Sequence, residues 1–149
     1  MSELVAQVDV GATQQQVWDA LVDWERQSEW IPLTRVRRTA QGGAGVGAGI
    51  EGWTGIGPVG FLDPMTITAW VPPARCEVRH TGRLVRGSAA FEVAPLPGDR
   101  VRLTWSEQIV PPFGRAGALA WQLATPIARL ALRQALRRFA RQFHPGPRP

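Results

Sequence analysis

Lysine, asparagine and tyrosine are all absent from this 149-residue sequence. A chain without lysine has no amine for a Schiff base and no Gly-Lys-Ser/Thr loop to hold the phosphates of a nucleotide. Two large groups of enzymes are therefore excluded. The three missing amino acids also share A/T-rich codons, which favours a GC-rich bacterial genome.

Cysteine and histidine are scarce. Cys76 is the only cysteine, so no disulfide forms within the chain, and His80 and His144 are the only histidines. Zinc sites are usually built from cysteine and histidine ligands, and many hydrolases use a Gly-x-Ser-x-Gly motif that this chain lacks. We therefore expect no metal and no cofactor.

Long hydrophobic runs are also absent. No apolar stretch approaches the roughly 20 residues of a membrane span. The N-terminal sequence MSELVAQVDV lacks the basic start and apolar centre of a secretory signal. We expect a cytoplasmic protein with a single domain over residues 1–144 and a flexible tail over residues 145–149.

Acidic residues are missing from the C-terminal segment. Residues 1–107 contain ten arginines and twelve acidic residues, whereas residues 108–149 contain seven arginines and no acidic residue. The net charge of +5 therefore comes from the C-terminal segment. A basic surface of this kind attracts nucleic acids and anionic membranes.

The N-terminal region predicts one strand followed by two short helices. Residues 3–10 alternate between apolar and polar side chains, as in a half-buried strand. Thr13 and Gln16 have the spacing of a capping box, and apolar residues follow at helical spacing as far as about Asp23. A second short helix is expected over WERQSEW, ending before Pro32.

Residues 33–110 predict a meander of antiparallel strands. Six segments of strand type are separated by QGGAG, GPVG, VPPA, TGR and PLPGD, which are typical of turns. Asp63 precedes Pro64 in FLDPMTI, so we expect it in a turn or bulge with a structural role. The glycines of GAGIEG match a dinucleotide-binding spacing, but no helix follows them, so we expect no nucleotide site.

The last segment predicts one long helix over residues 115–143. Pro126 is expected to kink or break it near its first third. A stripe of arginines at every fourth position lies beside an apolar arc, and this arc must be buried against the sheet. The arc consists of Ala128, Leu132, Ala135, Leu136, Phe139 and Phe143.

Several segments are similar, in the same order, to those of one known superfamily. They are VWDALVDWERQSEWIP, GVGAGIEGWTG, DPMTITAWVPPARCEVRHTG, FEVAPLPGDRVRLTW and the arginine-rich last helix. Together they resemble the START-related helix-grip superfamily (SRPBCC), and more closely its polyketide cyclase/dehydrase-like branch. The resemblance implies an α+β helix-grip fold: a curved seven-stranded antiparallel sheet around a long C-terminal helix, with two short helices after strand 1 and a cavity between sheet and helix. It implies no single reaction, because members share no universal catalytic motif.

Two titratable side chains are the candidate catalytic residues. In RVRLTWSEQIV, Glu107 lies on the apolar face of the strand, where burial raises the pKa of a carboxyl group. In RCEVRHTG, His80 lies on the same face as Cys76 and Val78, and histidine titrates near neutral pH. The structural alternative is an ion-paired glutamate and a hydrogen-bonded core histidine.

The candidate ligand-binding residues follow from the same alternation. Arg83 is expected near the mouth of the cavity, where it binds a carboxylate or enolate, unless it is simply exposed at the start of a strand. Trp24 and Trp30 are expected either to cover one end of the cavity or to be core residues. The full set is Arg83, Val85, Gly87, Phe91, Trp105, Trp24, Trp30 and Leu132.

Three functions are open on the sequence alone. We favour a non-catalytic binder of a small hydrophobic molecule that is lipid-like, aromatic or polyketide-like. The alternative is a polyketide cyclase or dehydratase in which Glu107 and His80 transfer protons and Arg83 stabilises negative charge. A third hypothesis is an interaction module whose basic C-terminal helix makes weak contact with an anionic membrane. Nucleic acid is not an expected partner, and either a monomer or a homodimer is consistent with the sequence.

Overall fold

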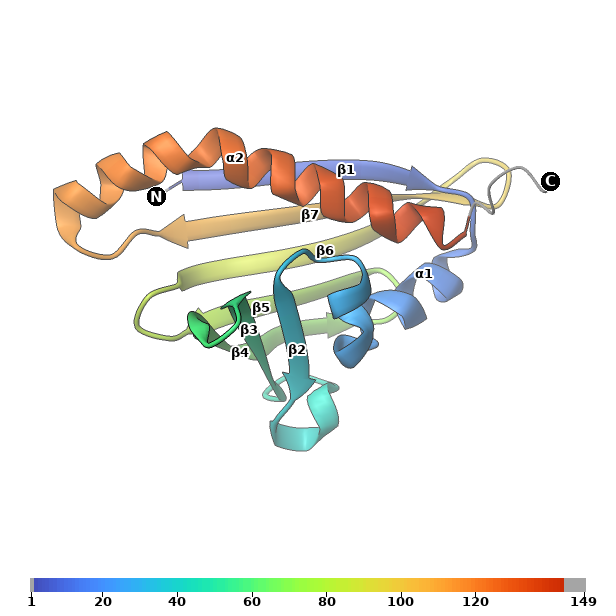
Figure 1. The fold of residues 1–149 in the computed structure, drawn as a ribbon. Helices are drawn as coiled ribbons and strands as arrows, with labels where there is room; N and C mark the ends of the chain where they lie inside the picture. Colours follow the sequence, from blue (N-terminus) through green and yellow to red (C-terminus); the bar gives the residue numbers. More distant parts are fainter. Residues whose placement is uncertain (1, 144–149) are drawn as a thin grey trace.

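The computed structural model describes residues 2–143, which form one strongly curved sheet with a long helix along it (Figure 1). The tail predicted over residues 145–149 lies outside the described residues. Among residues 2–143, no helix combines the length and the apolar composition that a membrane crossing needs. The elements in chain order are β1 (Ser2–Val10), α1 (Gln14–Leu21), η1 (Trp24–Glu29), β2 (Thr34–Arg38), η2 (Ala40–Gly43), β3 (Gly49–Ile56), β4 (Val59–Val71), β5 (Arg75–Thr81), β6 (Arg86–Leu96), β7 (Arg100–Val110) and α2 (Gly114–Arg141).

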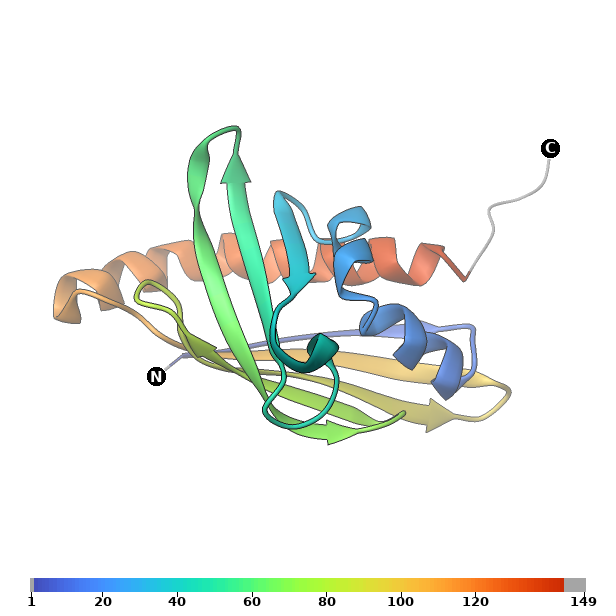
Figure 2. The same ribbon diagram turned by 90° about the horizontal axis from the view of Figure 1, so that it is seen from below.

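All seven strands belong to one antiparallel sheet with the order β1-β7-β6-β5-β4-β3-β2. The segment with α1 and η1 leads from one edge strand, β1, to the other, β2, and the chain then returns strand by strand until β7 pairs with β1. The β3–β4 hairpin turns away from the direction of β6 and β7 (Figure 2). The predicted α+β helix-grip fold with a seven-stranded antiparallel sheet is therefore confirmed.

The two predicted short helices connect the edge strands. Thr13 Oγ1 accepts a hydrogen bond from the backbone N–H of Gln16 at 3.2 Å, and Gln16 Oε1 accepts one from the backbone N–H of Thr13 at 2.9 Å. The predicted capping box is thus present, and α1 starts immediately after it. The second helix, η1, is a short 3-10 helix that ends at Glu29, before Pro32.

Strand β4 is longer than the sequence suggested. Asp63 and Pro64, which we expected in a turn or bulge, lie inside β4, and Pro64 pairs in regular register with Glu51 of β3. The irregularity of β4 lies further along, between Ile67 and Ala69. The predicted turn is therefore wrong. Pro64 fits because the pairing of β4 with β5 begins only after it, so the strand has a single neighbour at this point.

Helix α2 runs without a break from Gly114 to Arg141, so of the kink or break expected at Pro126, the break does not occur. Proline removes the N–H that would bond to the carbonyl of Gln122 one turn earlier. Both Pro126 and Gln122 are exposed, so water is able to replace this hydrogen bond.

The two halves of α2 have different surroundings. The C-terminal half is buried against the sheet through Ala135, Leu136, Phe139 and Ala140. Between Leu119 and Leu130, four large apolar side chains of α2 are exposed instead. These exposed residues are Leu119, Leu123, Ile127 and Leu130.

Buried side chains form two groups. The first lies between α2, α1 and strands β1, β6 and β7, and includes Trp30, Leu103 and Phe139. The second lies under η1 on the inner side of β2 to β6, and includes Trp24 and Ile67. The candidate site belongs to the second group.

Candidate functional site

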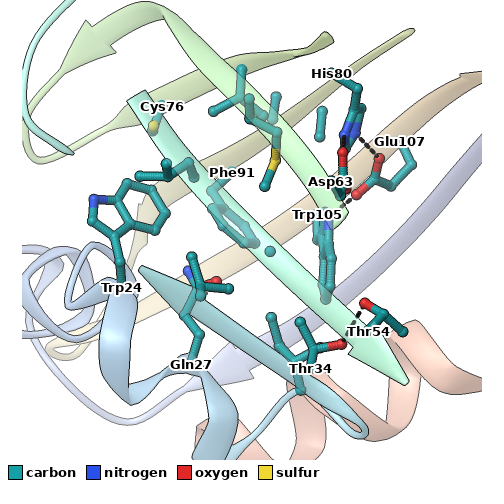
Figure 3. Close-up of a pocket in the computed structure, with 18 residues that line it drawn as sticks. Trp24, Gln27, Thr34, Thr54, Asp63, Cys76, His80, Phe91, Trp105 and Glu107 are labelled. Carbon is teal, nitrogen blue, oxygen red and sulfur yellow. Dashed lines mark hydrogen bonds and ion pairs between the residues drawn. The ribbon is translucent and has the colours of Figure 1, made fainter. Parts of the chain in front are cut away.

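A partly enclosed cavity of about 230 Å³ lies between η1 and the inner face of strands β2 to β7 (Figure 3). Most of its wall is apolar or aromatic, and its polar side chains are few. Trp24 and Gln27 of η1 close one side. The apolar wall includes Val36, Ile50, Met65, Val78, Ala89 and Phe91.

Three titratable side chains from three different strands meet in the cavity wall; we call Asp63, His80 and Glu107 the triad (Figure 3). His80 lies between the two carboxylates. Its Nδ1 is 2.9 Å from Asp63 Oδ1, and its Nε2 is 3.0 Å from Glu107 Oε2. The side chains of His80, Asp63 and Glu107 are only 4%, 16% and 14% exposed. Trp105 Nε1 donates to the second oxygen of Glu107, Oε1, at 3.0 Å.

Regular strand pairing brings the triad together. Asp63 lies two residues before the β4 residue that pairs with His80, so both side chains are on the same face of the sheet. His80 and Glu107 lie on either side of β6, where they pair with Gly87 and Ala89. Because these two residues of β6 are small, the imidazole and the carboxylate are able to meet across the strand.

The imidazole of His80 is held in its protonated form. Burial lowers its pKa, but the hydrogen bonds with Asp63 and Glu107 and the charges of these two carboxylates together outweigh burial and raise the pKa to about 10. The geometry agrees, because a neutral imidazole has one N–H, whereas both nitrogens of His80 face a carboxylate oxygen. At neutral pH the triad is therefore an imidazolium between two carboxylates.

Cys76 also lines the cavity as a free, buried thiol. Burial, with a smaller contribution from the charge of Glu77, raises the pKa of this thiol to about 12. The thiol is therefore neutral near pH 7 and is no nucleophile there. Among residues 2–143, no group of three or more histidine, cysteine, aspartate and glutamate side chains is arranged to hold a metal ion.

The space under the long helix is filled by an aromatic cluster of Trp30, Phe91, Trp105 and Phe139. The ring of Trp30 is 5.1 Å from that of Phe139, 6.0 Å from that of Trp105 and 6.1 Å from that of Phe91, measured between centroids. None of the described residues that line the cavity belongs to α2. The expected position between sheet and helix is thus occupied by these rings, and the hollow lies beside them.

Three of the predicted ligand-binding residues line the cavity, namely Trp24, Phe91 and Trp105. Trp24 is also fixed in place, since its Nε1 donates to the backbone carbonyl of Gly43 at 2.8 Å. Trp30 and Leu132 pack in the group of side chains under α2 and do not line the cavity. Of the two alternatives for the tryptophans, Trp24 faces the cavity and Trp30 is a core residue.

Arg83, Val85 and Gly87 also lie outside the cavity. Strand β6 begins at Arg86, so Arg83 and Val85 belong to the preceding loop and do not continue the alternation of the strand. Gly87 has a φ of 115°, and a Cβ at this position would lie 1.8 Å from the carbonyl oxygen of Gln108. Glycine is therefore required here by the backbone.

Sequence reasoning missed four polar residues of the site, namely Gln27, Thr34, Thr54 and Asp63. Asp63 has the same alternation as Met65 in β4, so the argument that selected Glu107 also applied to it, but the proline after it suggested a turn. Gln27 is buried in the wall, and its Nε2 donates to the backbone carbonyl of Leu21 at 2.9 Å. No pattern in the sequence identified Gln27, because a short 3-10 helix has no long periodicity.

The sequence matches one family model over residues 1–144, that of polyketide cyclase / dehydrase and lipid transport. The chain belongs to this family. The match spans nearly the whole chain and confirms the resemblance seen in its separate segments. No curated protein matches the sequence.

Solved structures with the same fold cover almost the full chain. TTHA0849 from Thermus thermophilus has a TM-score of 0.79 at 12% identity, covering 96% of this chain and 97% of that one. XoxI from Bacillus cereus has a TM-score of 0.74 at 12% identity, covering 97% of each chain. CV1439 from Chromobacterium violaceum has a TM-score of 0.72 at 16% identity, covering 97% of this chain and 99% of that one. At these identities the similarity concerns the fold.

Proposed function

We propose that the protein binds a small, largely hydrophobic molecule in the cavity beside the aromatic cluster. The supporting observation is a hollow of about 230 Å³ with an apolar and aromatic wall and one convergent polar group, the triad. Small-molecule sites typically have this construction. Membership of a family described by polyketide cyclisation and lipid transport agrees with the proposal.

The size of the cavity limits the ligand. Its volume lies below the roughly 300–1,000 Å³ of sites for drug-sized molecules. A molecule with one or two rings, or a short acyl chain, therefore suits it better than a long-chain lipid. Trp24, Phe91 and Trp105 provide aromatic surfaces against which a flat ring stacks.

Binding is tested on purified protein with naphthol and indole as probes. We expect each probe to raise the melting temperature, and native mass spectrometry to show one bound molecule per chain. The variant Ala89→Phe fills the cavity, because Ala89 is buried and lines it. Ala118→Phe is the matched control, because Ala118 is exposed on α2.

The proposal predicts that Ala89→Phe abolishes the shift in melting temperature and that Ala118→Phe retains it. Equal shifts for the wild type and Ala89→Phe would mean that the probes bind elsewhere. No shift and no bound mass with any apolar probe of this size would remove the proposal.

A second candidate function is proton-transfer catalysis on a polyketide-like substrate, and the triad supports it. An enzyme that closes or dehydrates a ring must take a proton from a carbon next to a carbonyl group. Glu107 is the base in this hypothesis, since it lines the cavity and His80 and Trp105 hold its carboxylate in position. Arg83 has no part in it, because Arg83 lies outside the cavity.

Catalysis is tested by deuterium exchange at the carbon between the carbonyl groups of an aryl 1,3-diketone, followed by NMR. A proton moves from this carbon to Glu107, and a deuteron from solvent replaces it, so the probe stays chemically unchanged. We expect Glu107→Gln to reduce the protein-dependent rate by about 100-fold. A rate equal to that of the wild type would exclude Glu107 as the base.

The third hypothesis concerns contact with anionic membranes, and the exposed surface of α2 supports it. The apolar residues Leu119, Leu123, Ile127 and Leu130 are exposed along its first and middle turns, and exposed arginines follow toward its C-terminus. Apolar side chains beside basic ones are typical of helices that lie on a lipid surface. Sedimentation with vesicles containing phosphatidylserine tests this: binding should weaken as salt increases, and no binding at low salt would contradict the hypothesis.

A further inference from the structure

The net charge of the cavity wall is negative. Of the described residues that line the cavity, the ionisable ones are the three members of the triad and Cys76. Two carboxylates and one imidazolium give the triad a formal charge of −1, and a neutral imidazole would make the charge more negative. None of the arginines within residues 2–143 lines the cavity. The one cation that a negatively charged ligand would meet in the described wall is the imidazolium of His80, and both of its nitrogens already face carboxylate oxygens.

The hydrogen-bond donors of the triad are already in use. Both nitrogens of His80 face carboxylate oxygens, at 2.9 Å and 3.0 Å, and the indole N–H of Trp105 is bonded to Glu107. The acceptors are in excess by contrast, because a carboxylate has about four acceptor positions. Asp63 and Glu107 thus keep free acceptor capacity at the cavity wall.

Donors elsewhere in the wall are mostly satisfied as well. The indole N–H of Trp24 is bonded to the carbonyl of Gly43 at 2.8 Å. Thr34 donates to the carbonyl of Pro32 at 3.0 Å, so the contact of 3.1 Å between the two hydroxyls makes Thr54 the donor to Thr34. What remains is the second N–H of the Gln27 amide, and the weakly donating thiol of Cys76.

We infer that the cavity selects apolar molecules with a hydrogen-bond donor, above all a protonated amine and next a hydroxyl group, and that it rejects carboxylates of the same skeleton. The ammonium or hydroxyl group of the ligand donates to Glu107 or Asp63, while its apolar part lies against Phe91 and Met65. This inference rests on the proposed function, because it concerns the ligand of the same cavity.

A cavity with this preference is unsuited to fatty acids, which carry a carboxylate. A carboxylate in the cavity would face two like charges at close range in a site from which most water is excluded, where charge interactions are strong. A neutral ketone would have no free donor in the triad to bind its oxygen. A phenol, an alcohol or an amine meets neither obstacle.

The test is a calorimetric titration at pH 7 with naphthylmethylamine, naphthylmethanol and naphthoate, which share one apolar skeleton. We expect the amine to bind at least about 100-fold more tightly than the carboxylate, with the alcohol between them. A carboxylate that binds as tightly as the amine would overturn the inference and leave the proposed function intact. Failure of all three compounds to bind would overturn both the inference and the proposed function.

Glu107→Gln assigns the selectivity to the triad, since it removes one charge with little change in shape. We expect it to weaken binding of the amine by at least about 10-fold and to change binding of the alcohol much less. Glu92→Gln is the matched control, because Glu92 lies on β6 with its side chain 52% exposed outside the cavity. If Glu107→Gln and Glu92→Gln weaken binding of the amine equally, the inference is contradicted. If Glu107→Gln does not fold, Asp63→Asn replaces it, and the ranking of ligands by the wild type decides the question by itself.

Discussion

Under the C-terminal half of α2, Leu103, Leu136 and Phe139 are fully buried, and the ring of Trp30 packs against rings from β6, β7 and α2. Under η1, the inner face of the same sheet borders a hollow of about 230 Å³, and its wall contains the triad. We call these regions the packed half and the hollow half. A bent sheet is thus able to stabilise the fold in one place and keep a cavity in another.

The two halves meet at Phe91 and Trp105. Both rings belong to the aromatic cluster of the packed half, and both also line the cavity of the hollow half. Trp105 in addition holds Glu107 through its indole N–H. Rigid packing on one side therefore fixes the position of the site on the other.

The largest difference between the halves should appear on truncating an apolar side chain. Phe139→Ala in the packed half should lower the free energy of unfolding by about 3–5 kcal/mol, because a closed cavity replaces a fully buried ring. Met65→Ala in the hollow half should cost only about 1 kcal/mol, because Met65 already borders open space. Urea unfolding of both variants measures the two free energies. Equal decreases for Phe139→Ala and Met65→Ala would remove the distinction between the halves.

The second prediction concerns pH and isolates the hollow half. Because folding raises the pKa of His80 from 6.5 to about 10, the folded state binds the proton more tightly than the unfolded state. The resulting stabilisation is complete below about pH 6.5 and is lost as the pH rises toward 10. We expect the free energy of unfolding to fall by about 2 kcal/mol between pH 7 and pH 9.

Urea unfolding at a series of pH values measures this slope. His80→Gln is the control, and it should be less stable at pH 7 but should lack the slope. A wild-type protein whose stability is constant from pH 7 to pH 9 would show that the imidazolium is not bound between the two carboxylates.

A smaller effect is expected where the two halves meet. Trp105→Phe keeps an aromatic ring but removes the N–H that donates to Glu107, and a hydrogen bond to a charged group contributes about 1.5 kcal/mol or more. Trp70→Phe is the control, because Trp70 packs on Trp18 in the hollow half and its indole N–H has no protein acceptor among the described residues. Urea unfolding measures both variants. If Trp105→Phe and Trp70→Phe lower the free energy of unfolding by the same amount, Trp105 has no role in holding Glu107.

The smallest effect is expected outside both halves. Leu123 is 74% exposed on α2, so Leu123→Gln should change the free energy of unfolding by no more than about 0.5 kcal/mol. The same substitution at Leu136, which is 0% exposed, should cost several times more. A large loss at Leu123 would mean that another surface covers the N-terminal half of α2 in solution.

Local patterns were sufficient to predict much of the fold. The spacing of Thr13 and Gln16 predicted the start of α1, and alternation placed His80 and Glu107 on the inner face. These predictions succeeded because capping and side-chain alternation depend on a few neighbouring residues. Alternation gives the face of the sheet on which a side chain lies. Regular pairing of the strands then places side chains of the same face beside one another.

The remaining features depend on contacts between distant segments. Asp63 was assigned to a turn because the rule for a residue before proline ignores where the neighbouring strand ends. The sequence left a place at the cavity or in the core open for Trp30, and its stacking on Phe139 of the distant helix places it in the core. Arg83 was expected to continue a strand that instead begins at Arg86. None of these outcomes is contained in a short window of sequence.

The most direct test of the central claim, that the hollow half holds a small apolar molecule, is NMR of methionine methyl groups labelled with carbon-13. The sequence contains only Met1 and Met65, and Met65 lines the cavity, so the spectrum is simple and Met65→Leu assigns it. On titration with naphthylmethylamine, the Met65 signal should shift progressively and reach saturation, because an aromatic ring next to the methyl group changes its magnetic environment. A Met65 signal that stays in place up to the solubility limit of the probe would contradict the account.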